Sequence, residues 1–198
     1  MTTLKTTSPE QVSQQTDEQT TLIIGCGNLL RSDDAVGPVL IRRLWELGLP
    51  DHIRVCDGGT AGMDVAFQME GMDEVIIVDA CRTGADPGTL YEIPGHEVEA
   101  PPLTQMNLHA FRWDNAIAFG RWLLKDDYPS KVTVFLIEGT CFDFGMDISP
   151  EVAQSMETLV NELLKRYNPD KLPTHPIPGL VVHGIRDTSQ AEEASHES

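Results

Sequence analysis

The sequence predicts one α/β domain in three layers, a mostly parallel twisted sheet with helices on both faces. Short apolar runs alternate along the chain with segments in which apolar residues recur at helical spacing. Most of these runs are continuous stretches of Val, Ile and Leu, a pattern typical of strands buried on both faces of a parallel sheet. The chain has 198 residues, which is the length of one domain with tails rather than of two domains.

The first half of the predicted domain alternates two strands with two helices. TLIIG at 21–25 is a short apolar run and is predicted as the first strand. A helix is predicted after a polar loop because four apolar residues recur there at helical spacing, namely Val36, Leu40, Leu44 and Leu47. IRVCD at 53–57 is predicted as the second strand, and residues near 63–69 as a short helix.

The second half of the predicted domain begins with the strongest strand in the chain, EVIIVDA at 74–80. TLYEI at 89–93 follows a Pro-Gly turn signal and is predicted as an edge strand. A helical pattern covers 108–124, and KVTVFLIEG at 131–139 is predicted as the last core strand. A final amphipathic helix is predicted to begin near Pro150, with an apolar stripe made of Val152, Met156, Leu159, Val160, Leu163 and Leu164.

The predicted domain spans 21–168 and lies between two tails. Residues 1–20 are rich in Thr, Ser, Gln and Glu and are predicted to be disordered. Residues 169–198 form a Pro-rich and acidic tail, in which GLVVHGIR at 179–186 is either a short strand or a docking arm. The first twenty residues lack the apolar core of a signal peptide, and no run of eighteen apolar residues occurs. We therefore expect a cytoplasmic protein without a membrane-spanning helix.

The charge balance excludes some classes of partner. Asp and Glu number 31 against 14 Lys and Arg, which gives a net charge of −17. Such a surface repels phosphate backbones and anionic lipid heads, so nucleic acid and membranes are excluded, whereas a metal cation or a basic peptide fits. The four cysteines form no C-x-x-C pair, which disfavours a zinc ribbon or a thioredoxin motif, and they are predicted to be reduced, as in the cytoplasm.

Acidic side chains follow the predicted core strands, at the edge where a doubly wound sheet binds its ligands. Asp33 and Asp34 come after the first strand, Asp57 ends the second, and Asp79 ends the third. Glu138 ends the last core strand. Because crowded carboxylates repel one another, we expect a bound cation or a proton among them.

Each of these candidates also has a purely structural explanation. One of Asp33 and Asp34 is equally well explained as the cap of the following helix, and Asp57 before two glycines as a turn former. Glu138 is equally well explained by a bond to a backbone group, whereas Asp79 ends a Val and Ile run, which favours a functional role. His109, within NLHAFRWDNA, is by spacing alone more simply a structural or exposed histidine than a ligand.

Several familiar catalytic motifs do not occur in the sequence. Gly25 and Gly27 begin a G-x-G-x-x-G pattern, but its third position is Leu30, and the two aspartates before the next helix would repel a pyrophosphate. The sequence also has no P-loop, no G-x-S-x-G elbow and no H-E-x-x-H pattern. These absences disfavour a dinucleotide site, a P-loop enzyme, a serine hydrolase and a conventional zinc protease.

Three motifs and one histidine occur together in this chain: GCGNLLRSDDAVG at 25–37, VCDGGTAGM at 55–63, EVIIVDA at 74–80, and His109. Together they resemble the hydrogenase maturation endopeptidases, which trim a short C-terminal extension from the large-subunit precursor of [NiFe] hydrogenases. The resemblance covers 21–167, and the joint motifs are far more specific than any one of them. It implies an endopeptidase that acts as a monomer on a hydrogenase large-subunit precursor after nickel insertion.

The resemblance also implies a site for a divalent metal. Its three ligands fall on Asp34, Asp79 and His109, and some relatives have glutamate at the first of these positions. The ion implied is nickel carried by the precursor, although other divalent ions suit the same ligands. A precursor without nickel would meet an uncompensated cluster of negative charge, so cleavage would test whether the metal has been inserted. The stretch that follows the histidine, HAFRWDNAIAFGRW, is more aromatic and basic than is usual in the family.

The sequence leaves open how the peptide bond is broken. Either a metal polarises the carbonyl or activates water, or a carboxylate acts as general base, with Asp57 as the candidate. Gly58, Gly59 and Thr60 form a turn that is a candidate to donate backbone N–H groups to the substrate chain. Two other functions remain as alternatives, a non-proteolytic nickel-binding accessory protein of hydrogenase assembly and a metal-dependent hydrolase of small molecules.

Overall fold

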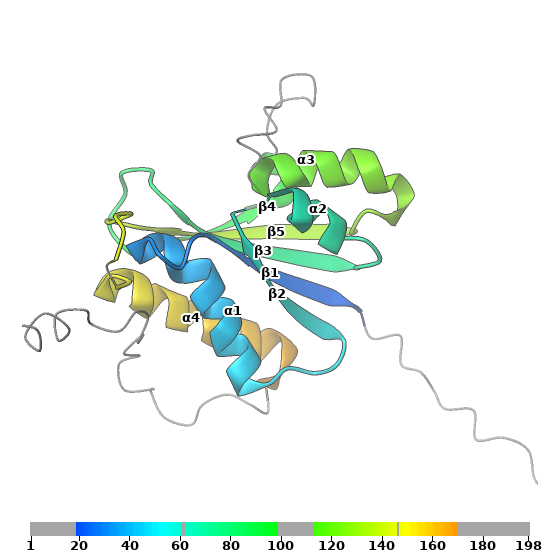
Figure 1. Ribbon diagram of the computed structural model, residues 1–198. Coiled ribbons are helices and arrows are strands. Elements are labelled where there is room, and N and C mark those ends of the chain that lie inside the picture. The colour runs from blue at the N-terminus through cyan, green and yellow to red at the C-terminus, as the bar shows by residue number, and fades with distance from the viewer. Residues whose placement is uncertain (1–18, 61, 99–112, 146, 170–198) are drawn as a thin grey trace, which may run out of the picture.

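The sheet of the computed structural model confirms the predicted three-layer α/β fold. The structure describes residues 19–60, 62–98, 113–145 and 147–169 (Figure 1). Five strands pair in the order β2-β1-β3-β5-β4, and they are β1 (Thr21–Cys26), β2 (Ile53–Gly59), β3 (Glu74–Cys81), β4 (Leu90–Pro94) and β5 (Lys131–Glu138). The first three of the four neighbouring pairs run parallel, and in the fourth, at the edge of the sheet, β4 lies antiparallel to β5. The predicted edge strand is therefore confirmed.

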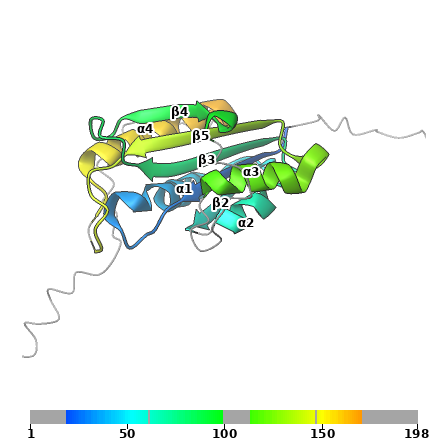
Figure 2. The same ribbon diagram turned by 90° about the horizontal axis from the view of Figure 1, so that it is seen from above.

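Helices cover both faces of this sheet (Figures 1 and 2). One face carries α1 (Val36–Leu47) and α4 (Pro150–Tyr167), and the other carries α2 (Gly62–Gln68) and α3 (Trp113–Leu124). Short 3-10 turns occur at η1 (Ser32–Ala35), η2 (Gly95–Glu97) and η5 (Lys125–Asp127). The predicted helix at 108–124 is confirmed from Trp113 onward, and its earlier residues lie outside the described part of the chain.

Strand β3 explains why the sheet needs helices on both sides. Its first seven residues are all buried, and their side chains alternate between the two layers. Val75 and Ile77 pack in the core beneath α2 and α3, whereas Ile76 and Val78 pack in the core beneath α1 and α4. A continuous apolar run therefore fits a central strand, as the sequence predicts.

The connections around β1 create a switch point in the sheet. Strand β1 pairs with β2 on one side and with β3 on the other, both in parallel. The β1–β2 connection passes through α1 on one face, and the β2–β3 connection passes through α2 on the opposite face (Figure 2). Because the connections leave in opposite directions, a crevice opens at the carboxyl ends of β1 and β3, where ligands bind in such folds.

The remaining predictions about organisation concern membrane-spanning helices, cysteines and tails, and the structure speaks of them only within the described residues. No helix within the described residues is long and apolar enough to cross a membrane. None of the four cysteines is disulfide-bonded in the part of the chain that the structure describes. The two predicted tails, including the segment at 179–186, fall almost wholly outside the described residues, so what the sequence predicts of them stays a prediction.

Candidate active site

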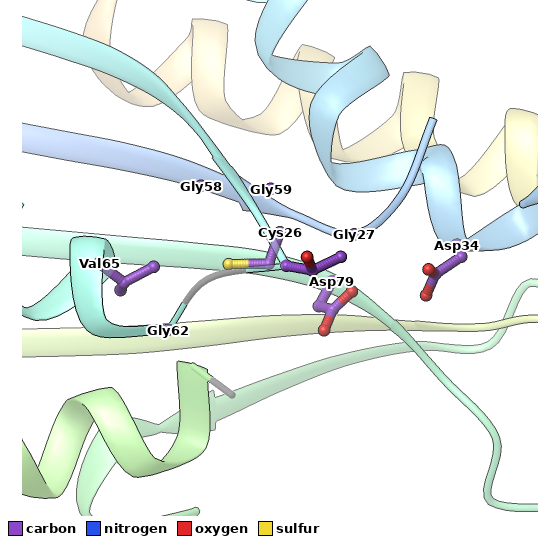
Figure 3. A pocket seen from close by; sticks show the side chains of 9 residues that line it. Cys26, Gly27, Asp34, Gly58, Gly59, Gly62, Val65 and Asp79 are labelled. Carbon is purple, nitrogen blue, oxygen red and sulfur yellow. The ribbon is translucent and has the colours of Figure 1, made fainter. Parts of the chain in front are cut away.

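A cavity of about 220 Å³ lies at the switch point, where the carboxyl ends of β1, β2 and β3 converge. Figure 3 shows it from close by, with the start of α2 along one side. Small residues form much of its wall, and the full lining is Cys26, Gly27, Asp34, Gly58, Gly59, Thr60, Gly62, Val65 and Asp79. A cavity that combines a mostly small and apolar wall with a few polar groups is typical of a ligand or active site.

Two of the predicted ligands, Asp34 and Asp79, line this same cavity. Asp79 belongs to β3, is only 5% exposed, and accepts the Ala80 N–H at its Oδ1 over 2.8 Å. Asp34 belongs to the η1 turn that follows β1 and is half-buried. In Figure 3 the Asp34 side chain is turned toward Asp79. Two carboxylates on one small cavity give it a concentrated negative charge that favours a cation.

Glycines in the first motif allow helix α1 to approach the end of β1. A Cβ atom on Gly25 would lie 2.1 Å from the Gly37 carbonyl oxygen, and one on Gly37 would lie 2.2 Å from the Cys26 carbonyl oxygen. Gly27 has a φ of +132°, and a Cβ atom there would lie 1.8 Å from the carbonyl oxygen of Asp34. The spacing of these glycines therefore serves close packing of backbone on backbone, which brings Asp34 to the cavity.

Asp33, the neighbour of Asp34, points away from the cavity and is fully buried. Its Oδ2 accepts the N–H groups of Thr140 and Cys141, and its Oδ1 accepts the N–H of Ser149 over 2.7 Å. Burial opposes ionisation of Asp33, but these backbone hydrogen bonds outweigh it and lower the pKa of the carboxyl. The prediction that one of the two aspartates caps the next helix is wrong for Asp33, because its carboxylate instead ties η1 to the segment between β5 and α4.

Glu138 also serves the loops rather than the cavity. Its carboxylate accepts the N–H groups of Thr83 and Gly84, each at 2.8 Å, together with the Thr83 hydroxyl and the Cys81 thiol. Burial opposes ionisation of Glu138, yet these hydrogen bonds lower its pKa to about 2. Burial, the bond to Glu138 and the nearby negative charges raise the pKa of the Cys81 thiol to about 12, so it stays protonated at neutral pH. The explanation of Glu138 by bonds to backbone groups is thus confirmed.

The depressed pKa of Glu138 predicts a defined dependence of stability on pH. Because its pKa falls from 4.5 to about 2 on folding, its contribution is complete above pH 4.5 and is lost as the pH falls toward 2. Glu138→Gln should therefore be less stable than the wild type at pH 7. The difference in free energy of unfolding should narrow between pH 4.5 and pH 2, as measured by urea unfolding across that range. A difference that stays constant with pH would contradict this role of the carboxylate.

Asp57 does not line the cavity. The pairing of β1 with β2 shifts between Gly25 and Cys26, so that Gly58 bulges out of register. Asp57 is exposed at this bulge, and its Oδ1 accepts the N–H of Gly59 over 2.9 Å. This contact supports the explanation of Asp57 as a turn former. Its predicted role as general base gains no support from the geometry and stays a prediction.

The predicted substrate-binding turn does reach the cavity, because Gly58, Gly59 and Thr60 all line it. The Gly59 N–H is already bonded to Asp57, and the Gly59 carbonyl accepts the Gly27 N–H over 2.9 Å. These two bonds shape the cavity wall and leave Gly59 less suited to bond a substrate chain than the prediction assumes. Gly59 has a φ of +50°, which favours glycine at this position.

The third predicted ligand, His109, lies outside the described residues. Among the residues that the structure describes, no three His, Cys, Asp or Glu side chains gather into a metal-binding group. The described part of the site thus supplies two carboxylates of the predicted set. Cys26 and Val65 also line the cavity, although no motif in the sequence marks them as site residues. Cys26 ends β1 and Val65 lies in the first turn of α2. Whether these side chains face the cavity depends on how the two elements pack, which the pattern of apolar residues does not show.

Comparisons with known proteins agree on one family. The model of the hydrogenase maturation protease family matches residues 38–166, a range that includes Asp79 and begins after Asp34. The hydrogenase 2 maturation protease of Escherichia coli (strain K12) is 28% identical over 145 residues, which are 72% of this chain and 87% of that protein. The hydrogenase expression/formation protein HupD of Rhodobacter capsulatus is 29% identical over 147 residues, 73% of this chain and 69% of that protein.

A solved structure agrees with these sequence relatives. The hydrogenase maturating endopeptidase HybD from E. coli matches this fold with a TM-score of 0.63 and 27% sequence identity. The match covers 75% of this chain and 91% of that chain. A hydrogenase maturation protease from Thermococcus kodakarensis, at 19% identity and a TM-score of 0.59, supports the fold alone.

Proposed function

The chain belongs to the hydrogenase maturation protease family and is an endopeptidase, and on this premise we propose that it matures a [NiFe] hydrogenase. The proposed reaction is removal of a C-terminal extension from the large-subunit precursor after nickel has been inserted. The observation that carries this proposal is the placing of Asp34 and Asp79 on one cavity at the switch point of the sheet.

The donor set of the cavity suits a nickel ion brought by the precursor. Asp34 and Asp79 offer carboxylate oxygens from two different elements, and His109 is proposed to add an imidazole nitrogen. Carboxylate oxygens and imidazole nitrogens coordinate nickel well. Asp79 is buried, with 5% of its surface exposed, so water solvates its charge little and a cation beside it is favourable. A precursor that already holds nickel would therefore gain ligands here, whereas an unloaded one would meet repulsion only.

The residues around the two carboxylates have distinct proposed tasks. The glycine-lined wall formed by Gly27, Gly58 and Gly59 leaves room for a peptide backbone to approach the carboxylates. Asp34 and Asp79 orient the precursor through its metal, which holds the bond to be cut at the cavity. Nickel, when the precursor brings it, can polarise a carbonyl or lower the pKa of a bound water.

The experiment that tests the proposed function follows the mass of the precursor. Nickel-loaded large-subunit precursor incubated with this protein should lose a C-terminal peptide, which intact-mass spectrometry detects directly. A precursor that binds the protein and keeps its full mass would favour the alternative of a nickel-binding accessory protein. If the protein hydrolyses small-molecule substrates and leaves the precursor intact, the alternative of a metal-dependent hydrolase of small molecules would be favoured.

The same assay tests the proposed third ligand. His109→Ala should abolish cleavage of the loaded precursor while the protein stays folded, because the site would lose its nitrogen donor. His96→Ala is the matched control, since His96 is exposed in η2, which follows β4 at the other end of the sheet. The control should cut at the wild-type rate. Normal processing by folded His109→Ala would show that the ligand assignment is wrong.

A further inference from the structure

We propose that Asp33 is a positioning residue whose buried carboxylate holds Asp34 toward the cavity. The inference rests on the proposed function, because it assigns Asp34 a task that Asp33 supports. Asp33 does not touch the cavity: it is fully buried, and both of its carboxylate oxygens are occupied by groups from the segment between β5 and α4. It therefore acts through its neighbour rather than on the substrate.

The contacts of Asp33 join two segments that are far apart in the sequence. Its Oδ2 accepts the Thr140 N–H over 2.8 Å, the Cys141 N–H over 2.9 Å and the Thr140 hydroxyl over 3.1 Å. Its Oδ1 accepts the Ser149 N–H over 2.7 Å, at the residue that precedes α4. The Asp33 N–H in turn donates to the Cys141 carbonyl over 3.1 Å. The η1 turn is thus fixed from outside itself.

The η1 turn needs such external support. Ser32 has a φ of +36°, a value that residues other than glycine seldom adopt, and its hydroxyl donates to the Asp147 carbonyl over 2.8 Å. Within the described residues, η1 has no side-chain cap bond at its N-terminus. An unsupported turn of this kind would relax toward commoner backbone angles, and Asp34, which follows Asp33 directly, would lose its direction into the cavity.

Only a carboxylate suits this position. Among the described residues, four hydrogen bonds to the two oxygens come from donors, three backbone N–H groups and the Thr140 hydroxyl. An asparagine would set its own NH2 group against at least one backbone N–H, since an amide has a single acceptor oxygen. The substitution Asp33→Asn therefore keeps the size of the side chain and breaks the tie on one side. This makes it a sharp test of positioning.

The experiment measures Ni²⁺ binding by the isolated full chain with titration calorimetry, alongside thermal unfolding and precursor cleavage. Asp33→Asn should weaken Ni²⁺ binding about 10- to 100-fold, as loss of a group that orients a metal ligand typically does. The matched control is Glu74→Gln, which removes another buried carboxylate, one that pairs with Lys131 over 2.7 Å at the opposite end of β3. The control should lower Tm while leaving Ni²⁺ affinity unchanged.

The outcomes separate this inference from the proposed function. If Asp79→Asn weakens Ni²⁺ binding but folded Asp33→Asn does not, the positioning role is overturned and the metal site stands. If the wild type binds no Ni²⁺ alone and cuts no precursor, the proposed function fails, and this inference fails with it. If Asp33→Asn does not fold, Thr140→Val is measured in its place, since it removes only the hydroxyl donor to Asp33. A weaker Ni²⁺ affinity in Thr140→Val supports positioning, and an unchanged affinity overturns it.

Discussion

Replacing Asp79 with Asn is expected to abolish processing of the nickel-loaded precursor in a protein that remains folded. Asp79 is 5% exposed and is one of the two carboxylates on the cavity, so the substitution removes a buried negative charge with little change in shape. We expect the cleavage rate to fall by at least about 100-fold, since groups that merely support a ligand are worth about 10- to 100-fold. Time courses of intact mass measure this loss.

A charge-matched control separates a local effect from a general one. Asp51→Asn removes the same charge from an exposed position just before β2, at the amino end of the strand, whereas the cavity lies at the carboxyl ends. It should process the precursor at the wild-type rate, and both variants should show a native circular dichroism spectrum. If folded Asp79→Asn cuts the precursor as fast as Asp51→Asn, Asp79 is not part of the active site.

Replacing Gly25 with Ala is expected to cause a large loss of stability. A Cβ atom there would lie 2.1 Å from the carbonyl oxygen of Gly37 and 2.6 Å from Cγ1 of Ile41. The oxygen belongs to the backbone of α1, so relief requires the helix to move away from β1. Overpacking costs about 1–3 kcal/mol and occasionally more, and we expect about 3 kcal/mol or more here, measured as the free energy of unfolding in urea.

The control for this prediction is a glycine whose only demand is conformational. Gly71 has a φ of +72°, and no described atom outside its immediate neighbours lies within 4 Å of a Cβ atom built there. Gly71→Ala should cost about 1–2 kcal/mol, the usual strain of a left-handed conformation. Gly25→Ala should be clearly less stable than Gly71→Ala. Equal losses in the two variants would mean that close packing between β1 and α1 is not what the first motif provides.

Most of the fold could be predicted because its signals are local. The nearly continuous apolar run at 74–80 predicts a strand buried on both faces, and β3 is buried on both faces in the structure. The helix predicted after Pro150 from its apolar spacing is also confirmed, because α4 buries the predicted stripe of apolar residues. The turn before 89–93 indicated an edge strand, although apolar pattern alone does not say that this strand runs antiparallel to β5.

The site could be predicted only in part, because its geometry depends on how distant loops meet. The sequence gathers Asp33, Asp34, Asp57, Asp79 and Glu138 at one edge, but the structure turns only Asp34 and Asp79 into the cavity. Nothing in the spacing of the chain indicates that the segment after β5 returns to bond Asp33, more than a hundred residues away. Likewise the bulge at Gly58, which leaves Asp57 outside, arises from the pairing of two strands.

The measurement that tests the account most directly compares two preparations of one hydrogenase large-subunit precursor, nickel-loaded and nickel-free. Each is incubated with the wild-type protein and with Asp34→Asn, and the C-terminus is followed by intact-mass spectrometry. The account predicts that the wild type shortens the loaded precursor and leaves the nickel-free one intact, because only the loaded form brings the ion for Asp34 and Asp79. The variant should cut neither form. Equal cleavage of both forms by the wild type would contradict the claim that these two carboxylates recognise the precursor's nickel.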